Sequence, residues 1–325
     1  MSAERDDRAG HASPAAAAGR PRLGRPRDWL IGALLLAAVL VAIDQTIGWA
    51  ALLAPWKTLS PLVLATAFLL TSASYLLRAV RVYDFFAPRM VGRFAVVVRL
   101  SVLHNTANNL LPMRAGEMVF PWLMRRWLGH GFLAAGASLV WIRLLDLHFL
   151  GLIAILILWL RDPAWLWPLV ALAWIGLLPL AALLRRIDAA GQAGEGRLAQ
   201  ITRFVANAGP GDSRRIARLY AWTALSWALK LTAFAAILRH FVPVEFWRVL
   251  AGVMGAELST VLPFHGIAGS GSFELAAMAA MVPFGVAPEQ ALAGAVNLHL
   301  FLLGCTVILG LLALLMRPSN PRNGS

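Results

Sequence analysis

Long apolar runs alternate with short polar stretches along this chain, a pattern typical of a protein that crosses a bilayer several times. One transmembrane helix needs about 20 predominantly apolar residues. Runs of about this length occupy 29–54, 59–77, 132–160, 163–184, 219–238 and 291–316. We therefore predict an all-α polytopic membrane protein with about six full spans.

Two further apolar regions, 94–128 and 246–284, contain Pro and Gly near their middles. Because Pro removes a backbone donor and Gly weakens a helix, neither region favours one continuous helix. Broken backbone at membrane depth is tolerated only against other protein or beside a wet cavity. We predict two re-entrant or broken helical hairpins, and eight spans in total if the hairpins cross the membrane.

Composition supports the membrane assignment. Hydrophobic residues make up 59% of the chain and charged residues only 14%, and the mean hydropathy is +0.70. An ordinary soluble domain has about 25% charged residues. The single cysteine, Cys305, excludes an intramolecular disulfide.

The net charge of +13 is explained by orientation. With six spans and an inside N-terminus, the cytoplasmic segments hold most of the 29 basic residues; these segments are 1–28, 78–99, 125–126, 185–218 and 317–325. Cytoplasmic loops of membrane proteins carry an excess of Lys and Arg. We therefore predict a bacterial inner (plasma) membrane protein with both termini in the cytoplasm, and no nucleic-acid partner.

The same layout predicts the domain organisation. We expect a disordered basic tail at 1–28, one transmembrane domain at 29–317 and a cytoplasmic tail at 318–325. The transmembrane domain divides into halves at about 29–160 and 163–316. Its cytoplasmic loop, 185–218, is too short to bury an independent catalytic core. Any chemistry is then expected in or at the membrane.

The first broken region contains the most polar stretch of the apolar chain, HNTANNLLPMRAGE at 104–117. Intramembrane polar groups mark functional sites by default. Arg114 could hold a phosphate through two hydrogen bonds, or form an internal ion pair with Glu117. The candidate lipid-binding residues here are His104, Asn105, Asn109, Arg114 and Glu117.

The second broken region repeats the order Pro, Gly, Glu within 262–274. On the predicted topology the two segments enter from opposite sides, as expected of an inverted repeat whose broken segments meet around a site. Gly269 and Gly271 allow close approach of the backbone, and free N–H groups there could bind an anion. Glu274 is a candidate for lipid binding or, equally, a capping carboxylate for the following helix.

Other charged residues lie inside predicted spans. Arg143 and Asp146 share a helix face and are expected to pair, whereas Lys230 has no partner nearby in the sequence. Arg78, at a cytoplasmic border, is either an orientation anchor or a headgroup contact. In the last span, Asn297 and His299 could line a cavity opposite Arg143.

Four stretches resemble the lysylphosphatidylglycerol synthase transmembrane-region family, a flippase-like family; they are LLRAVR (76–81), NLLPMRAGE (109–117), IRLLD (142–146) and LPFHGIAGSGSFE (262–274). The resemblance covers roughly residues 30–316. The chain departs from it at 265–268, where many relatives have Pro and Gly-Gly, and in the last span, where Asn297 or His299 replaces a frequent Arg. AVNLHLFLLG and WALKLTAF look similar to a branch of the family that accompanies hopanoid biosynthesis.

This resemblance implies a lipid translocator or lipid-binding transporter for an anionic phospholipid, isoprenoid or hopanoid-type lipid. The chain resembles only the membrane half of the full-length synthases, whose soluble part transfers the aminoacyl group. The alternatives are an intramembrane enzyme or accessory subunit for lipid modification, with a lipid-biosynthesis enzyme as partner, and a scaffold. The chain has no HExxH, GxSxG or Walker motif, and we predict no cofactor and no metal.

Overall fold

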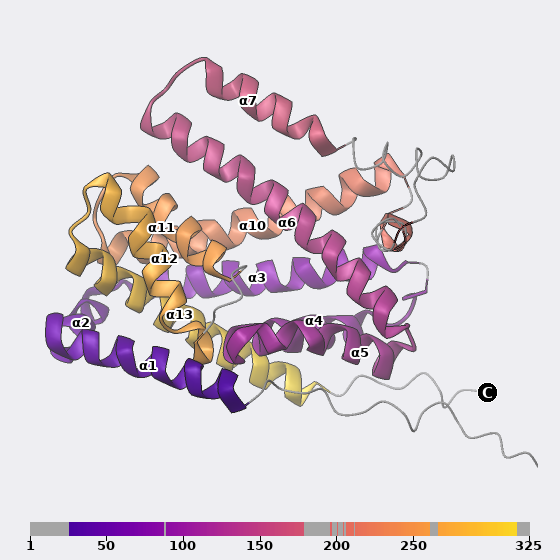
Figure 1. Cartoon of the computed structure of the whole chain (residues 1–325), viewed down its shortest axis with the longest axis horizontal. Coiled ribbons are helices and arrows are strands. Elements are labelled where there is room, and N and C mark those ends of the chain that lie inside the picture. The colour runs from indigo at the N-terminus through magenta and orange to yellow at the C-terminus, as the bar shows by residue number, and fades with distance from the viewer. Residues whose placement is uncertain are drawn as a thin grey trace, which may run out of the picture.

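The computed structural model describes residues 26–87, 89–178, 196, 200, 204, 206–210, 212–260 and 266–316, without the side chains of residues 113 and 114. Every regular element in this part of the chain is a helix, which confirms the all-α prediction (Figure 1). Most of the predicted N-terminal tail, most of the 185–218 loop and the C-terminal tail lie outside the described residues.

Within the described residues, six segments are long and apolar enough to cross a membrane: α1 (Pro26–Thr46), α3 (Pro61–Phe85), α6 (Phe132–Arg161), α10 (Ser213–Phe241), the segment Ile267–Phe284 and α13 (Pro288–Leu315). Five of them coincide with predicted spans. The sixth belongs to the second broken region. Of the predicted span 163–184, residues 163–178 are described, and they include the ten-residue helix α7 (Leu166–Ile175). The exact number of spans stays a prediction.

The first span is shorter than its apolar run. The helix α1 ends at Thr46, and a separate short helix, α2 (Trp49–Leu53), follows before the 3-10 turn η2 (Ala54–Thr58). Gly48 between them has φ 77°, a left-handed conformation that favours glycine. The prediction of one span over 29–54 is therefore corrected at its C-terminal end.

The helices α3 and α10 pack side by side in opposite directions. Asp84 near the end of α3 pairs with Arg218 near the start of α10, and Arg78 on α3 stacks on Trp227 further along α10. Small residues such as Thr71 and Ser226 are fully buried between helices. Small side chains let transmembrane helices approach closely, and this antiparallel pair is the framework on which both broken hairpins are placed.

The first hairpin consists of α4 (Phe94–Leu110), the 3-10 turn η3 (Pro112–Met118) and α5 (Val119–Leu128). The helix α4 stops because Leu111, which precedes a proline, has an extended conformation with φ −84° and ψ 137°. Gly116 then lies against α4, where an added Cβ would be 2.3 Å from the backbone nitrogen of Asn108. The predicted break at Pro112 is confirmed.

The second hairpin consists of α11 (Phe246–Ser259), the turn η4 (Ile267–Gly269), α12 (Ser272–Met281) and the turn η5 (Val282–Phe284). It follows the end of α10, whereas the first hairpin follows the end of α3. Because α3 and α10 are antiparallel, the two hairpins enter the bundle from opposite ends (Figure 1). Their turns η3 and η4 contact each other, and Pro112 and Ile267 both pack on Gly32 of α1. Residues 261–265, which include Pro263, lie outside the described residues.

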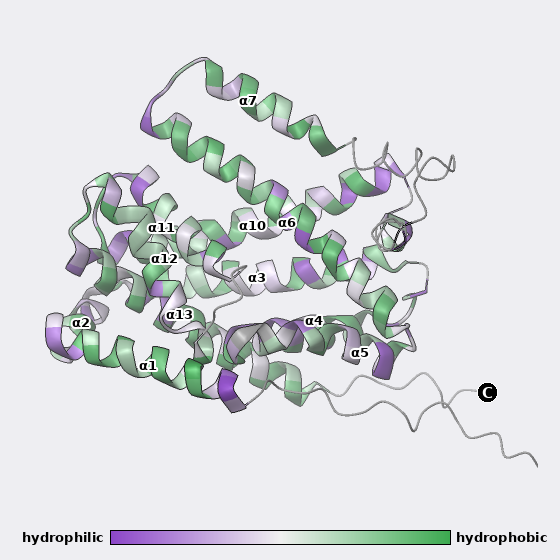
Figure 2. Ribbon diagram, viewed as in Figure 1, coloured by the Kyte–Doolittle hydropathy of each residue, from purple (hydrophilic) through white to green (hydrophobic). Residues whose placement is uncertain are grey.

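The distribution of polarity is that of a membrane protein. The long helices consist mostly of hydrophobic residues (Figure 2), and many of these are exposed, such as Leu62 and Leu133, which are 75% and 72% exposed. Charged side chains such as Arg81, Glu257 and Glu274 are instead almost completely buried. Buried ionisable groups facing the interior of an apolar bundle indicate a multi-pass membrane protein with an internal polar site.

Candidate functional site

A small polar cavity of about 50 Å³ lies where α3, α4, η3, α6, α10 and α11 converge. Six of the predicted site residues line it: Arg78, Asn105, Asn109, Glu117, Arg143 and Lys230. The other lining residues are Ser74, Tyr75, Asn108, Trp227, Glu257 and Thr260. The cavity therefore collects polar residues from segments far apart in the sequence.

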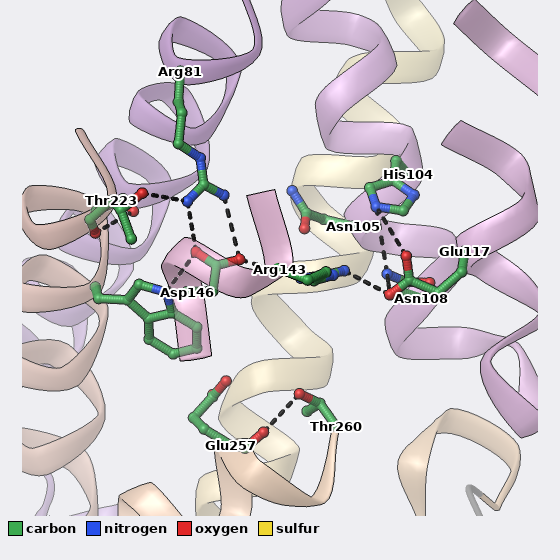
Figure 3. A network of polar contacts seen from close by, with 12 residues as sticks. Arg81, His104, Asn105, Asn108, Glu117, Arg143, Asp146, Thr223, Glu257 and Thr260 are labelled. Atoms are coloured by element: carbon green, nitrogen blue, oxygen red, sulfur yellow. Dashed lines mark hydrogen bonds and ion pairs between the residues drawn. The ribbon is translucent and has the colours of Figure 1, made fainter. Parts of the chain in front are cut away.

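A chain of ion pairs crosses one wall of the cavity (Figure 3). Arg143 contacts Glu117 at 2.7 Å and Asp146 at 3.5 Å. Asp146 contacts Arg81 at 2.5 Å and accepts a hydrogen bond from the indole Nε1 of Trp227 at 2.9 Å. The expected Arg143–Asp146 pair is present, but each member has a shorter contact on a different helix. Asp146 thereby connects α6 with α3 and α10.

Arg81 is a residue that the sequence reasoning missed. It lies in the same LLRAVR stretch as Arg78, and its position near a span end favoured an orientation role. The structure instead buries it to 2% exposure, with its guanidinium between Asp146 and the hydroxyl of Thr223. Its spacing of three residues from Arg78 was the available signal, since both then lie on one helix face.

Lys230 has a partner that its own helix could not supply. Its Nζ lies 2.7 Å from the carboxylate of Glu257 on α11, and the ring of Phe234 lies 4.9 Å from the same nitrogen. Both charged residues are buried. A buried pair of this kind is costly to break because one charge is then left without compensation.

Arg78 differs from the other cations of the cavity. Among the described residues no carboxylate lies within ion-pair distance of it, and its guanidinium lies over the ring of Trp227 at 4.7 Å. Its Nη2 atom is buried without a hydrogen-bond partner. The lining as a whole has three cations (Arg78, Arg143, Lys230) against two carboxylates (Glu117, Glu257). A buried guanidinium edge in a net positive cavity is suited to an anion.

Some polar residues of α4 line the cavity, and others stabilise the packing of α4 against neighbouring elements. The amide of Asn109 donates to Tyr75 and to Thr306, at 3.0 and 2.9 Å, and that of Asn108 donates to Glu117 at 3.1 Å. His104 is buried and contacts the carbonyl oxygen of Gly116 at 3.2 Å, which joins α4 to η3. His104 therefore supports the turn and does not line the polar cavity. The side chain of Arg114 lies outside the described residues.

A larger apolar groove of about 560 Å³ adjoins the polar cavity. The two share Glu117, Arg143, Trp227 and Thr260, so their boundary is lined by polar groups. The rest of the groove is mostly apolar, with Met118, Pro121, Phe132, Leu133, Val140, Leu144, Leu147 and Leu150 among its residues. The combined site is therefore amphipathic, with the charged polar cavity on one side and the apolar groove on the other.

The remaining predicted site residues lie elsewhere. Gly269, Gly271, Glu274 and His299 gather around η4 and the start of α12, and none of them lines the polar cavity. The N–H of Gly271 donates to Glu274 at 2.8 Å, which is the capping arrangement. Asn297 accepts from the indole of Trp56 and donates to the carbonyl oxygen of Leu52, so it joins α13 to α2 and η2.

These features define a multi-pass membrane protein with an internal polar site beside an apolar groove. The described residues contain no group of three His, Cys, Asp or Glu that could hold a metal ion. The chain belongs to the lysylphosphatidylglycerol synthase transmembrane-region family, whose model matches residues 29–310. No match to the chain is found among curated proteins or among solved structures. Family membership makes this a lipid-related membrane protein.

Proposed function

We propose that this chain is an inner-membrane lipid translocator of the flippase-like type, or a lipid-binding transporter, that binds an anionic headgroup. The main observation behind this proposal is that the net positive cavity at Arg78 adjoins the apolar groove of about 560 Å³. A phospholipid, an isoprenoid phosphate or a hopanoid-type lipid with an anionic headgroup has the same division into a charged end and a hydrocarbon end.

The headgroup would bind between Arg78 and Arg143. A guanidinium binds phosphate through two parallel hydrogen bonds. The Nη2 of Arg78 is buried, has no hydrogen-bond partner and can therefore donate to a phosphate. Arg143 is already 2.7 Å from Glu117, so a phosphate would compete with that carboxylate. This competition allows binding of the lipid to rearrange η3, the turn on which Glu117 lies.

The hydrocarbon chain would lie along α6 in the groove. Leu133, Val140, Leu144 and Leu147 supply a continuous apolar wall there. Burial of each methylene group contributes about 0.8 kcal/mol, so even part of a chain adds considerable affinity. The polar boundary residues Arg143 and Thr260 would then lie at the level of the headgroup.

The arrangement of the two hairpins is the basis for proposing translocation. They enter the bundle from opposite ends and contact each other through η3 and η4. This is the arrangement expected of an inverted repeat that alternates access to a central site. On this basis we propose the inverted repeat. The distribution of basic residues supports an inside location of both termini, and a hopanoid-type lipid is one of the proposed substrates.

A second candidate function is suggested by the family description, which names a synthase region. On that account the chain would be the membrane part or an accessory component of a lipid-modifying system. Deleting it would then change the lipid composition of the membrane, whereas loss of a translocator changes the distribution of lipids between leaflets. Leaflet-resolved lipid analysis of deletion and wild-type cells separates the two.

The translocator proposal is tested in liposomes with labelled phosphatidylglycerol, comparing wild type, Arg78→Gln and Arg218→Gln. Loss of one charged hydrogen-bonding group costs about 1.5–3 kcal/mol, so Arg78→Gln is expected to slow translocation by about tenfold to a hundredfold. Arg218, at the end of the same α3–α10 interface, is 57% exposed and is the matched control. Equal rates for folded wild type, Arg78→Gln and empty vesicles would contradict the proposal.

A further inference from the structure

A buried contact between a histidine and a glutamate joins the second hairpin to α13, and the proposed lipid site does not use it. His299 on α13 lies with its Nδ1 2.6 Å from Glu274 Oε1 and its Nε2 2.8 Å from the carbonyl oxygen of Ala268. Glu274 and His299 are 3% and 4% exposed. The ring of Phe273 stacks on the imidazole at 4.4 Å. The imidazole is thus fixed between two oxygen atoms.

This geometry requires one proton more than a neutral histidine and a carboxylate provide. A neutral imidazole donates from only one ring nitrogen. Its second nitrogen would then present a lone pair to an oxygen lone pair at hydrogen-bond distance. Two donated hydrogen bonds need either an imidazolium beside a carboxylate, or a neutral imidazole beside a protonated Glu274 that donates to Nδ1. In both cases the pair has one extra proton and no net charge.

The contrast with His148 shows that this requirement is specific. His148 also has contacts at both nitrogens, with Tyr220 Oη at 2.9 Å and the carbonyl oxygen of Trp174 at 2.8 Å. A tyrosine hydroxyl both donates and accepts, so a neutral His148 satisfies both contacts. Glu274 already accepts from Gly271 through its other oxygen, and only an added proton makes it a donor.

The backbone held by this pair is strained. Ala268 has φ 55°, and Gly269 and Gly271 have φ 80° and 86°. A non-glycine residue in the left-handed region is strained because its Cβ lies too close to the following carbonyl oxygen, whereas glycine adopts this region freely. The contact of His299 with the carbonyl oxygen of Ala268 holds this turn, so loss of the proton would release it. The turn η4 contacts η3, where Glu117 lines the lipid cavity.

Other ionisable groups do not replace the proton. The helix α13, which carries His299, also contacts α2, α3 and α10, whose Arg81 and Lys230 pair with Asp146 and Glu257. The elements that contact η4 and α12 are α1, α4, α11, α13, η3 and η5. Their other described ionisable side chains are Arg27, Asp28, Asp44, Arg99, His104, Glu117, Arg248, Glu257, Glu289 and Cys305. The contacts of these side chains lie elsewhere: Arg99 donates to the carbonyl oxygen of Ala313, Glu117 contacts Arg143, and Glu257 contacts Lys230.

We propose that the His299–Glu274 pair is a proton-binding site that couples a proton gradient to movement of the second hairpin. The proton enters from the aqueous phase and bonds to the pair, which closes η4 on α13. Its release to the other side leaves a neutral His299 and an ionised Glu274, so the pair goes from no net charge to one negative charge. The repelled oxygen and nitrogen atoms then separate and free the turn. This coupling rests on the proposed translocation.

Glu274→Gln gives a sharp test because it imitates the protonated state permanently. A glutamine amide donates to Nδ1 of a neutral His299 and still accepts from Gly271. Vesicles of phosphatidylcholine with labelled phosphatidylglycerol are given a pH gradient, with and without a protonophore. Wild type and the matched control His148→Gln are expected to translocate several-fold faster with the gradient. Glu274→Gln and His299→Gln are expected to have the same rate with and without it.

The outcomes separate the coupling from the proposed function. Wild-type translocation that ignores the gradient overturns the coupling and leaves the translocator standing. Absence of wild-type translocation overturns the translocator, and infrared difference spectra over a pH titration then decide the proton site. A protonation change present in wild type and His148→Gln but lost in Glu274→Gln supports the site. A wild-type spectrum identical to that of Glu274→Gln overturns it.

Discussion

The carboxylates at the tips of the two broken hairpins have partners of different kinds. Glu117 in the first hairpin contacts Arg143 on α6 and lines the polar cavity. Glu274 in the second contacts His299 on α13 and the N–H of its own helix start. The two segments share Pro, Gly and Glu in the same order, yet the first faces a site and the second closes on its own backbone.

The chemistry of each broken hairpin therefore depends on the helix that it faces. The helix α6 brings Arg143 and Asp146 towards η3, and α3 adds Arg78 and Arg81. The helix α13 brings His299 to η4, with Phe273 stacked on it. The first hairpin therefore meets several charges that a headgroup can rearrange, and the second meets one titratable partner.

The largest effect is expected from Asp146→Ala, which removes the carboxylate between Arg81 and Arg143. Breaking a buried ion pair from one side costs about 3–5 kcal/mol, because the remaining charges stay buried without compensation. We expect a large fall in the thermal unfolding temperature of the detergent-solubilised protein. Asp84→Ala, which unpairs the exposed Arg218, is the control and is expected to have a much smaller effect. Equal losses would show that Asp146 does not organise the first hairpin's site.

An intermediate effect is expected from alanine at the hairpin glycines. Gly116→Ala places a Cβ 2.3 Å from the backbone of Asn108 and must push η3 away from α4; overpacking of this kind costs about 1–3 kcal/mol, occasionally more. Gly271→Ala meets only Leu35 at 3.3 Å, and its φ of 86° costs about 1–2 kcal/mol. Unfolding curves should rank Gly116→Ala as the more damaging variant. The reverse order would contradict the packing of η3 on α4.

The smallest effect is expected from Glu117→Gln, and here the direction of the change in lipid affinity is the informative result. The change frees Arg143 from a competing carboxylate and adds one net positive charge to the cavity. At an effective dielectric constant near 20 this favours an anion by about 1 kcal/mol after screening, or about fivefold in affinity. Titration with labelled phosphatidylglycerol should show tighter binding in Glu117→Gln and unchanged binding in Glu274→Gln. Weaker binding in Glu117→Gln would place the headgroup elsewhere.

Much of this organisation could be predicted from the sequence, because apolar runs determine spans and polar residues within them are costly. That logic identified Arg78, Glu117, Arg143 and Lys230 before their positions were known. It also located the break at Pro112, since proline ends a helix by local chemistry.

The rest depends on how helices pack, which periodicity does not encode. Lys230 lies on α10 and Glu257 on the next helix, α11. They pair only because α11 folds back against α10, and the sequence pattern does not indicate this packing. Arg81 was not among the predicted site residues, because its carboxylate partner Asp146 is 65 residues away in the sequence. Asn297 was expected opposite Arg143, but its face of α13 meets Leu52 and Trp56 instead.

The central claim is that an anionic headgroup binds at Arg78 with its hydrocarbon chain in the groove along α6. It is tested most directly by electron cryomicroscopy of the protein in nanodiscs that contain phosphatidylglycerol. The account predicts phosphate density within hydrogen-bond distance of Arg78 and Arg143, continuous with chain density beside Leu133 and Leu147. Headgroup density confined to the ends of the bundle, with the cavity at Arg78 filled only by water, would contradict it.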